Sequence, residues 1–170
     1  MDCNSFKSCI ASLENCDMKE QSCSQSGCLK SFDDRKKIVV EEKKKKYQLS
    51  NSKSDKVACF HVDGGMVMSQ DSIKCDNLLV DIDSKLAIFV ELKGTDLKHA
   101  LEQVNATLVK LLSGLSNYRM FARIVTSNRT NVPNIKTCPQ YVALSRKILK
   151  NRGDIIIHAN IIEDDVNNMK

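Results

Sequence analysis

The chain is poor in aromatic residues and has no segment long enough to cross a membrane. Only 5% of its 170 residues are aromatic and none is Trp, so we do not expect a platform of aromatic side chains that stacks nucleic-acid bases. No apolar run approaches the roughly 20 residues that span a bilayer, and the first residues lack a signal-peptide pattern. We therefore expect a cytoplasmic protein that does not associate with a membrane.

The cysteines and histidines also lack a clear metal-binding pattern. Five of the eight cysteines lie in the first 28 residues: Cys3, Cys9, Cys16, Cys23 and Cys28. They could bind zinc, but structural zinc sites use tighter, paired spacings. Reduced cysteines that fill small apolar spaces are the favoured interpretation. His61, His99 and His158 show no mutual spacing that indicates a metal site.

Length and charge are compatible with one domain that binds nucleic acid. With 42% hydrophobic residues, the chain can bury a substantial core, and we expect a single domain over residues 1–170. The net charge of +5 is a mild excess that suits a nucleic-acid partner. The four consecutive lysines at 43–46 either contact phosphate or protect an exposed strand edge. Arg119, Arg123 and Arg129 are further basic candidates.

Two apolar runs in the middle of the chain predict a buried β-hairpin. Residues 78–82 and 86–90 carry apolar side chains on both strand faces, which is typical of central strands. If Asp83 and Ser84 form a two-residue turn, counting back along both strands places Asp76 opposite Glu91. Their Cβ atoms would then lie roughly 4.5–5.5 Å apart.

The open end of this hairpin has the residues for a phosphodiester-cleaving metal site. Lys93 follows Glu91 by two positions and therefore shares its face. Facing carboxylates repel each other unless a cation lies between them, and Mg²⁺ suits an incomplete shell of oxygen ligands. We expect Asp76, Glu91 and the Leu92 carbonyl to bind Mg²⁺, for which Mn²⁺ can substitute. The metal would activate a water, and Lys93 would orient or deprotonate that water or stabilise the phosphate charge.

The segment from Asp76 to the motif Phe89-Val90-Glu91-Leu92-Lys93-Gly94 resembles the PD-(D/E)XK nuclease superfamily. The resemblance covers about residues 57–162, with Cys75 in place of the Pro of the motif. It implies a restriction-endonuclease-like α/β fold, in which a central mixed β-sheet is flanked by helices in the order αβββαβ. It also implies that Asp76 and Glu91 bind the metal and that Lys93 assists the attacking water.

A long helix is predicted directly after this motif. Its apolar stripe consists of Leu97, Leu101, Val104, Leu108, Leu111 and Leu115, which recur at helical spacing. Thr95 or Asp96 can cap its start, and the stripe should pack on the sheet. Gln103 lies off the stripe, on a polar side with His99. Members of the resembled family place a Gln on this helix near the active site, so Gln103 is our candidate for that residue.

The other patterns complete a mixed order of strands and helices from residue 57 onward. They predict a strand at 57–68 that bends at 63–65, a strand at 120–126, a loop at 131–134, a helix at 141–150 and a strand at 154–162. With the hairpin and the long helix, the first five elements match the strand–strand–strand–helix–strand part of the resembled core.

The first 56 residues predict a helix followed by a charged segment. Apolar residues fall on one helical face over 5–18, and short strands are expected at 38–40 and 47–49. The resembled family often has one more acidic residue ahead of its first strand. Glu14 is the first candidate for this residue, and Glu41 and Glu42 are alternatives.

Two functions are compatible with these patterns. The first is a Mg²⁺-dependent nuclease that cuts DNA rather than RNA, as an endonuclease rather than an exonuclease, in restriction, phage defence or repair. The second is a catalytically inactive module of the same fold that binds nucleic acid or a partner protein. The intact set of Asp76, Glu91 and Lys93 favours the first. A homodimer or a partner subunit would help so small a chain to select its substrate.

Overall fold

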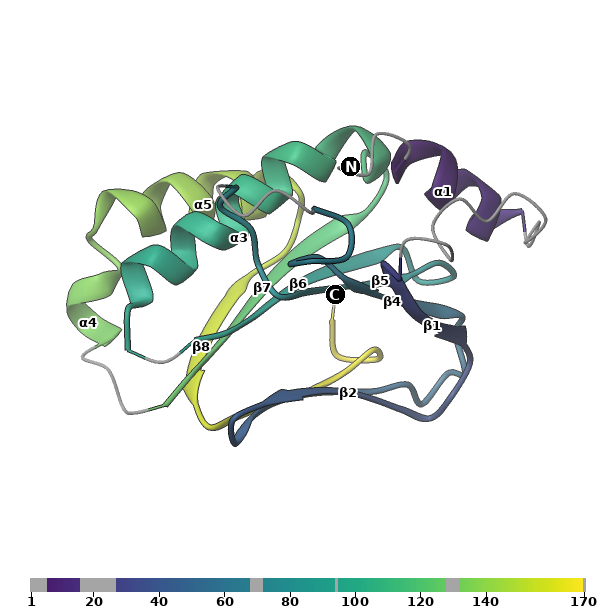
Figure 1. Cartoon of the computed structure of the whole chain (residues 1–170), viewed down its shortest axis with the longest axis horizontal. Helices are drawn as coiled ribbons and strands as arrows, with labels where there is room; N and C mark the ends of the chain where they lie inside the picture. Colours follow the sequence, from purple (N-terminus) through teal and green to yellow (C-terminus); the bar gives the residue numbers. More distant parts are fainter. Residues whose placement is uncertain (1–5, 16–26, 68–71, 94, 128–131, 170) are drawn as a thin grey trace.

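Six strands rich in apolar residues form a mixed β-sheet at the centre of the molecule (Figure 1). The computed structural model describes residues 6–15, 27–67, 72–93, 95–127 and 132–169. The strands are β1 (Leu29–Asp33), β4 (Val57–His61), β5 (Asn77–Asp81), β6 (Leu86–Leu92), β7 (Arg119–Thr126) and β8 (Ile155–Ala159). Their spatial order is β1-β4-β5-β6-β7-β8, antiparallel from β1 to β6 and parallel from β6 to β8. Strands β5 and β6 are buried along their whole length, as expected for central strands.

Helices cover one face of this sheet (Figure 1). They are α1 (Phe6–Glu14), α3 (Leu97–Leu111), α4 (Val132–Ile135) and α5 (Pro139–Lys150), and a 3₁₀ turn, η2 (Leu112–Gly114), extends α3. All six residues of the predicted apolar stripe are buried, five of them on α3 and Leu115 directly after η2. Asp96 caps the helix, because its Oδ1 accepts a hydrogen bond from the His99 amide at 3.0 Å. The prediction of an α/β protein with a central mixed sheet is therefore confirmed, but the helices lie on one face of the sheet only.

A smaller sheet covers the opposite face of the large one. Its strands are β2 (Lys37–Glu42), β3 (Lys45–Ser50) and β9 (Ile161–Asp165), and β3 pairs antiparallel with β2 and parallel with β9. Apolar side chains from both sheets fill the layer between them, among them Tyr47, Leu49, Ile88, Val90 and Val125. The sheet was predicted only as two short strands, because its third strand comes from the far end of the chain.

Arg123 lies inside this apolar layer and is only 1% exposed. Its Nε donates to Asp164 Oδ2 at 2.6 Å, and its Nη1 pairs with Asp154. The Tyr47 hydroxyl donates to the same Asp164 carboxylate at 3.0 Å. A buried and paired guanidinium cannot reach phosphate, so Arg123 is removed from the further basic candidates. Arg129 lies outside the described residues.

The strand predicted at 154–162 is in fact two strands. Asn160 adopts a left-handed conformation with φ of 67°, which Asn tolerates better than β-branched residues do. The chain turns there, so β8 stays in the large sheet while β9 pairs with β3. The apolar pattern runs through both strands, so Asn160 was the only sign of the turn in the sequence.

Two further boundaries differ from the predictions. The strand expected at 57–68 ends at His61, where a turn that includes Gly64 (φ 80°) begins, and Met68 lies outside the described residues. The segment expected to be a loop at 131–134 contains the start of the short helix α4, and Asn131 lies outside the described residues.

The helix predicted at 5–18 is present as α1 (Phe6–Glu14), and Ser5 and residues 16–18 lie outside the described residues. Cys9 is half-buried and Cys28 is buried. Cys3, Cys16 and Cys23 lie outside the described residues, so zinc binding by these cysteines stays an open alternative. Strand β1 was not predicted. In the part of the chain that the structure describes, no helix is both long and apolar enough to cross a membrane.

Candidate active site

The pairing of β5 with β6 brings Asp76 and Glu91 to facing positions. Asn77 pairs with Val90, so the next pair outward is Asp76 and Glu91, as predicted. The turn contains four residues, 82–85, rather than two, but the register is the same. The turn at the other end of the hairpin therefore fixes which residues meet at this open end.

Backbone amides hold both carboxylates in place. The Asp76 amide donates to Glu91 Oε2 at 3.1 Å, and the Leu92 amide donates to Asp76 Oδ2 at 2.7 Å. The remaining oxygens, Asp76 Oδ1 and Glu91 Oε1, make no hydrogen bond to the described part of the chain. Each strand thus fixes the acid of the other and leaves one oxygen atom of each available to a ligand.

Both carboxyl groups are harder to ionise than usual. Glu91 is 1% exposed, and burial together with the Asp76 charge raises its pKa to about 8. Burial also raises the pKa of Asp76, while the Leu92 amide and the Lys93 ammonium act to lower it. A divalent cation between the two acids would offset their repulsion and favour the ionised form of both.

Lys93 and Gln103 meet beside this pair. The Lys93 ammonium donates to Gln103 Oε1 at 2.9 Å, and the Gln103 amide group donates to the Lys74 carbonyl at 2.9 Å. Gln103 therefore links the Lys of the motif to the segment that leads into Asp76. The structure brings together all four side chains that the sequence singled out.

Thr107, one helical turn after Gln103, was not predicted as a site residue. Its hydroxyl accepts a hydrogen bond from the Cys75 amide and donates to the Gln103 carbonyl, both at 2.9 Å. It is buried among the apolar residues of α3. A polar residue on an otherwise apolar helical face was the signal in the sequence that could have identified it.

Further charged groups surround the open end of the hairpin. Lys74 Nζ lies 3.3 Å from Asp63 Oδ1, and Lys30 Nζ donates to Asn77 Oδ1 at 2.9 Å. The Asp63 charge raises the pKa values of both Asp76 and Glu91. The sequence offered little signal for these contacts, because they come from three separate segments.

Of the candidates for a third acid, Glu14 is placed at the wrong end of the hairpin. Its Oε1 accepts hydrogen bonds from Lys85 Nζ at 2.6 Å and from the Tyr118 hydroxyl at 2.7 Å, and Lys85 belongs to the β5–β6 turn. Glu42 is closer to the site, since its charge raises the pKa of Asp76. Glu41 has no described contact with the site.

The donor set at the open end fits Mg²⁺ with few protein ligands. Within the described ranges, no group of three or more Asp, Glu, His or Cys side chains is arranged to hold a metal. Mg²⁺, however, is commonly held by one or two carboxylates and keeps waters and substrate phosphate as its other ligands. Asp76 and Glu91 supply that number, and the Leu92 carbonyl stays a predicted third ligand.

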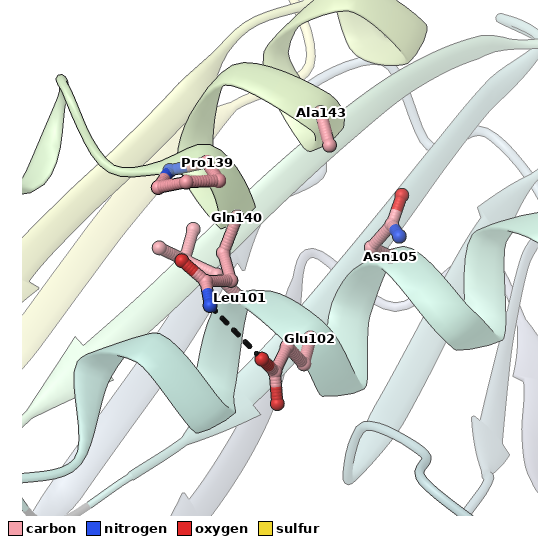
Figure 2. A pocket seen from close by; sticks show the side chains of 6 residues that line it. All are labelled: Leu101, Glu102, Asn105, Pro139, Gln140 and Ala143. Carbon is pink, nitrogen blue, oxygen red and sulfur yellow. Dashed lines mark hydrogen bonds between the residues drawn. The ribbon is translucent and has the colours of Figure 1, made fainter.

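A separate pocket of about 250 Å³ opens between α3 and α5 (Figure 2). It is lined by Leu101, Glu102, Asn105, Pro139, Gln140 and Ala143. The Gln140 amide group donates to Glu102 Oε1 at 3.1 Å across the pocket. This volume is below the range usual for small-molecule sites, and none of the acids of the hairpin lines it.

No protein-family model, no curated protein and no solved structure matches the chain. The chemistry of the site is therefore argued from its own residues.

Proposed function

We propose that the protein is a metal-dependent nuclease that hydrolyses phosphodiester bonds, in DNA rather than RNA. The observation that supports this most strongly is the facing pair Asp76 and Glu91, with Lys93 held beside it by Gln103. Ordinary surface charges are solvated, whereas Glu91 is buried, faces Asp76 across two central strands and is held by a backbone amide. A catalytic site requires side chains that are fixed in this way.

The order of elements supports a restriction-endonuclease-like core. Strands β4, β5 and β6 form an antiparallel meander, α3 follows, and β7 pairs parallel with β6. This is the strand–strand–strand–helix–strand order of the PD-(D/E)XK resemblance, with Asp76 directly before the second strand and Glu91 on the third.

In this mechanism Asp76 and Glu91 would hold the cation through the oxygens that accept no hydrogen bond from the described residues. Bound Mg²⁺, or Mn²⁺ in its place, would lower the pKa of a water and offset charge on the phosphate. The Lys93 ammonium donates hydrogen bonds to the attacking water or to a phosphate oxygen. Gln103 keeps Lys93 in place through the bond to its Oε1, and the Leu92 amide keeps the Asp76 carboxylate oriented.

The alternative is a non-catalytic module of the same fold that binds nucleic acid or a partner protein. The observation in its favour is that only two acids meet at the described site. A binding module has no use for a lysine beside one buried and one half-buried carboxylate, so we favour the nuclease.

Cleavage assays on a defined set of substrates test this proposal. The purified chain is incubated with supercoiled plasmid, linear duplex, single-stranded DNA and RNA, each with Mg²⁺, Mn²⁺ or EDTA. We expect DNA cleavage with either metal and none with EDTA, and nicking of closed plasmid would identify an endonuclease. Intact substrates under every condition would instead favour the binding module.

A further inference from the structure

The tip of the β2–β3 hairpin is built from lysines in a conformation that lysine disfavours. Glu42 pairs with Lys45, so Lys43 and Lys44 form a two-residue turn. Both have left-handed backbones, with φ of 46° and 67°. Turns that need two such residues strongly favour Asn-Gly, because a side chain is crowded in this region. Two lysines here are therefore not explained by the local structure.

The four lysines of this run differ in exposure. The Lys43 side chain is 82% exposed, with its Nζ 3.2 Å from Glu42 Oε1, and Lys44 is also exposed. Lys45 is only 6% exposed because its position faces the layer between the sheets. An exposed ion pair such as that of Lys43 is weak, so both tip ammonium groups can bind another anion.

Backbone hydrogen bonds fix this hairpin at the same end of the molecule as Lys93. The Lys93 amide donates to the Val125 carbonyl at 2.8 Å, at the end of β7. The Asn160 amide donates to the next carbonyl, that of Thr126, at 2.8 Å, and the Lys46 amide donates to the Asn160 carbonyl at 2.9 Å. In Figure 1 the tip of the β2–β3 hairpin accordingly lies beside the connection from β8 to β9.

The tip and the acid pair therefore lie at the same end of the molecule, although they belong to opposite layers. An extended polyanion at the open end of the sheet could contact both at once.

We propose that Lys43 and Lys44 bind the phosphodiester backbone of the nucleic acid whose scissile phosphate lies at Asp76 and Glu91. This inference rests on the proposed nuclease function and adds the surface that captures the substrate. Lysine is a flexible point charge that contacts phosphates without reading bases. The scarcity of aromatic residues is in keeping with contacts of this kind. Lysines kept only for solubility would not need the two turn positions that suit Asn and Gly.

The decisive variant is the double substitution Lys43→Asn and Lys44→Gly, which installs the sequence that the turn favours. We expect its melting temperature to rise, because the steric conflict is removed. Its affinity for a fluorescein-labelled DNA duplex, measured by anisotropy in EDTA, should fall roughly tenfold or more. The dependence of log affinity on log salt should flatten by about 0.9 for each DNA phosphate that the variant no longer neutralises.

The matched control is the double substitution Lys37→Gln and Lys150→Gln, which removes the same charge from exposed positions. Lys37 begins β2, at the end of the hairpin away from its tip, and Lys150 ends α5. We expect the control to retain most of the parent affinity and salt slope. Equal reductions in the two double variants would mean that net charge alone drives binding, and would overturn the proposal.

Other outcomes separate this inference from the nuclease proposal. If the parent chain cuts DNA and the turn variant binds with unchanged affinity and slope, the tip is a solvated edge and only this inference fails. If the parent binds without cutting and the turn variant does not bind, the tip is a binding site but the nuclease proposal fails. A parent chain that neither binds nor cuts would overturn both.

Discussion

The two ends of the β5–β6 hairpin each contain a buried acid with a raised pKa, but they use it differently. At the open end, burial and Asp76 raise the pKa of Glu91 to about 8. At the turn end, burial first and then the Asp55 charge raise the pKa of Asp81 to about 7, and Asp81 is fully buried. A raised pKa alone would mark both ends as functional sites.

Hydrogen bonding distinguishes the two ends. Asp81 Oδ1 accepts from the amides of Asp83 and Ser84, at 3.1 and 2.8 Å, and so shapes the turn. Its Oδ2 has no hydrogen-bond partner among the described residues but faces Asp55, so a proton held between the two carboxyl groups would satisfy it. At the open end Asp76 and Glu91 each accept one backbone amide, and Lys93 lies beside them. A lysine beside two facing acids indicates a metal site, whereas two turn amides on one acid indicate a structural role.

The largest difference between the two ends of the hairpin is expected in the rate of catalysis. Glu91→Gln and Lys93→Ala should each lower the single-turnover rate of Mg²⁺-dependent cleavage by about 10²–10³, because each removes one electrostatic contact to the reacting groups. Asp81→Asn is the control at the other end and should cut at nearly the parent rate. Folded Glu91 and Lys93 variants that cut as fast as the parent would show that the site assignment is wrong.

The next largest effect concerns stability without metal. Because the pKa of Glu91 is raised in the folded state from 4.5 to about 8, the folded protein holds that proton more tightly than the unfolded chain does. The free energy of unfolding in EDTA should therefore fall as pH rises from about 4.5 to 8, by roughly 1–3 kcal/mol. Denaturant titrations across this range measure it. Glu91→Gln should flatten the decline, and a decline of parental size in that variant would mean that another group causes it.

A smaller effect is expected from the helix that supports the open end. Gln103→Leu removes the partner of Lys93, and Thr107→Val removes the partner of the Cys75 amide. Each should lower kcat about tenfold with little change in KM, because geometry at the reacting centre is loosened. Thr107→Ser keeps the hydroxyl and should restore most of the rate. A Ser variant as slow as the Val variant would assign Thr107 to packing only.

The smallest effect is expected at the turn end. Asp81→Asn keeps an oxygen for the turn amides and can donate to Asp55, and it removes the carboxyl whose ionisation is disfavoured. The variant should therefore be more stable than the parent by about 1 kcal/mol at pH 8, with little difference at pH 5. Thermal unfolding at the two pH values measures this, and a lower stability than the parent at pH 8 would show that Asp81 serves as a charge.

The sequence was sufficient to predict which acids meet at the open end, because local rules of strand pairing determine this. The period of two along each strand and the short turn place Asp76 opposite Glu91, and the error in turn length changed nothing because the register was kept. Gln103 was singled out through the resemblance, and α3 brings it to Lys93. What depended on distant segments was missed or misassigned: Glu14 pairs with Lys85 at the far end, and the break at Asn160 sends β9 to the second sheet.

Direct measurement of metal binding tests the comparison between the two ends most directly. Isothermal titration with Mn²⁺ is carried out on the parent chain, Glu91→Gln, Asp76→Asn and Asp81→Asn at pH 8. We predict binding to the parent, the same binding to Asp81→Asn, and none in either open-end variant. Binding that persists in Glu91→Gln and Asp76→Asn, or that disappears in Asp81→Asn, would contradict the assignment of the metal to the open end.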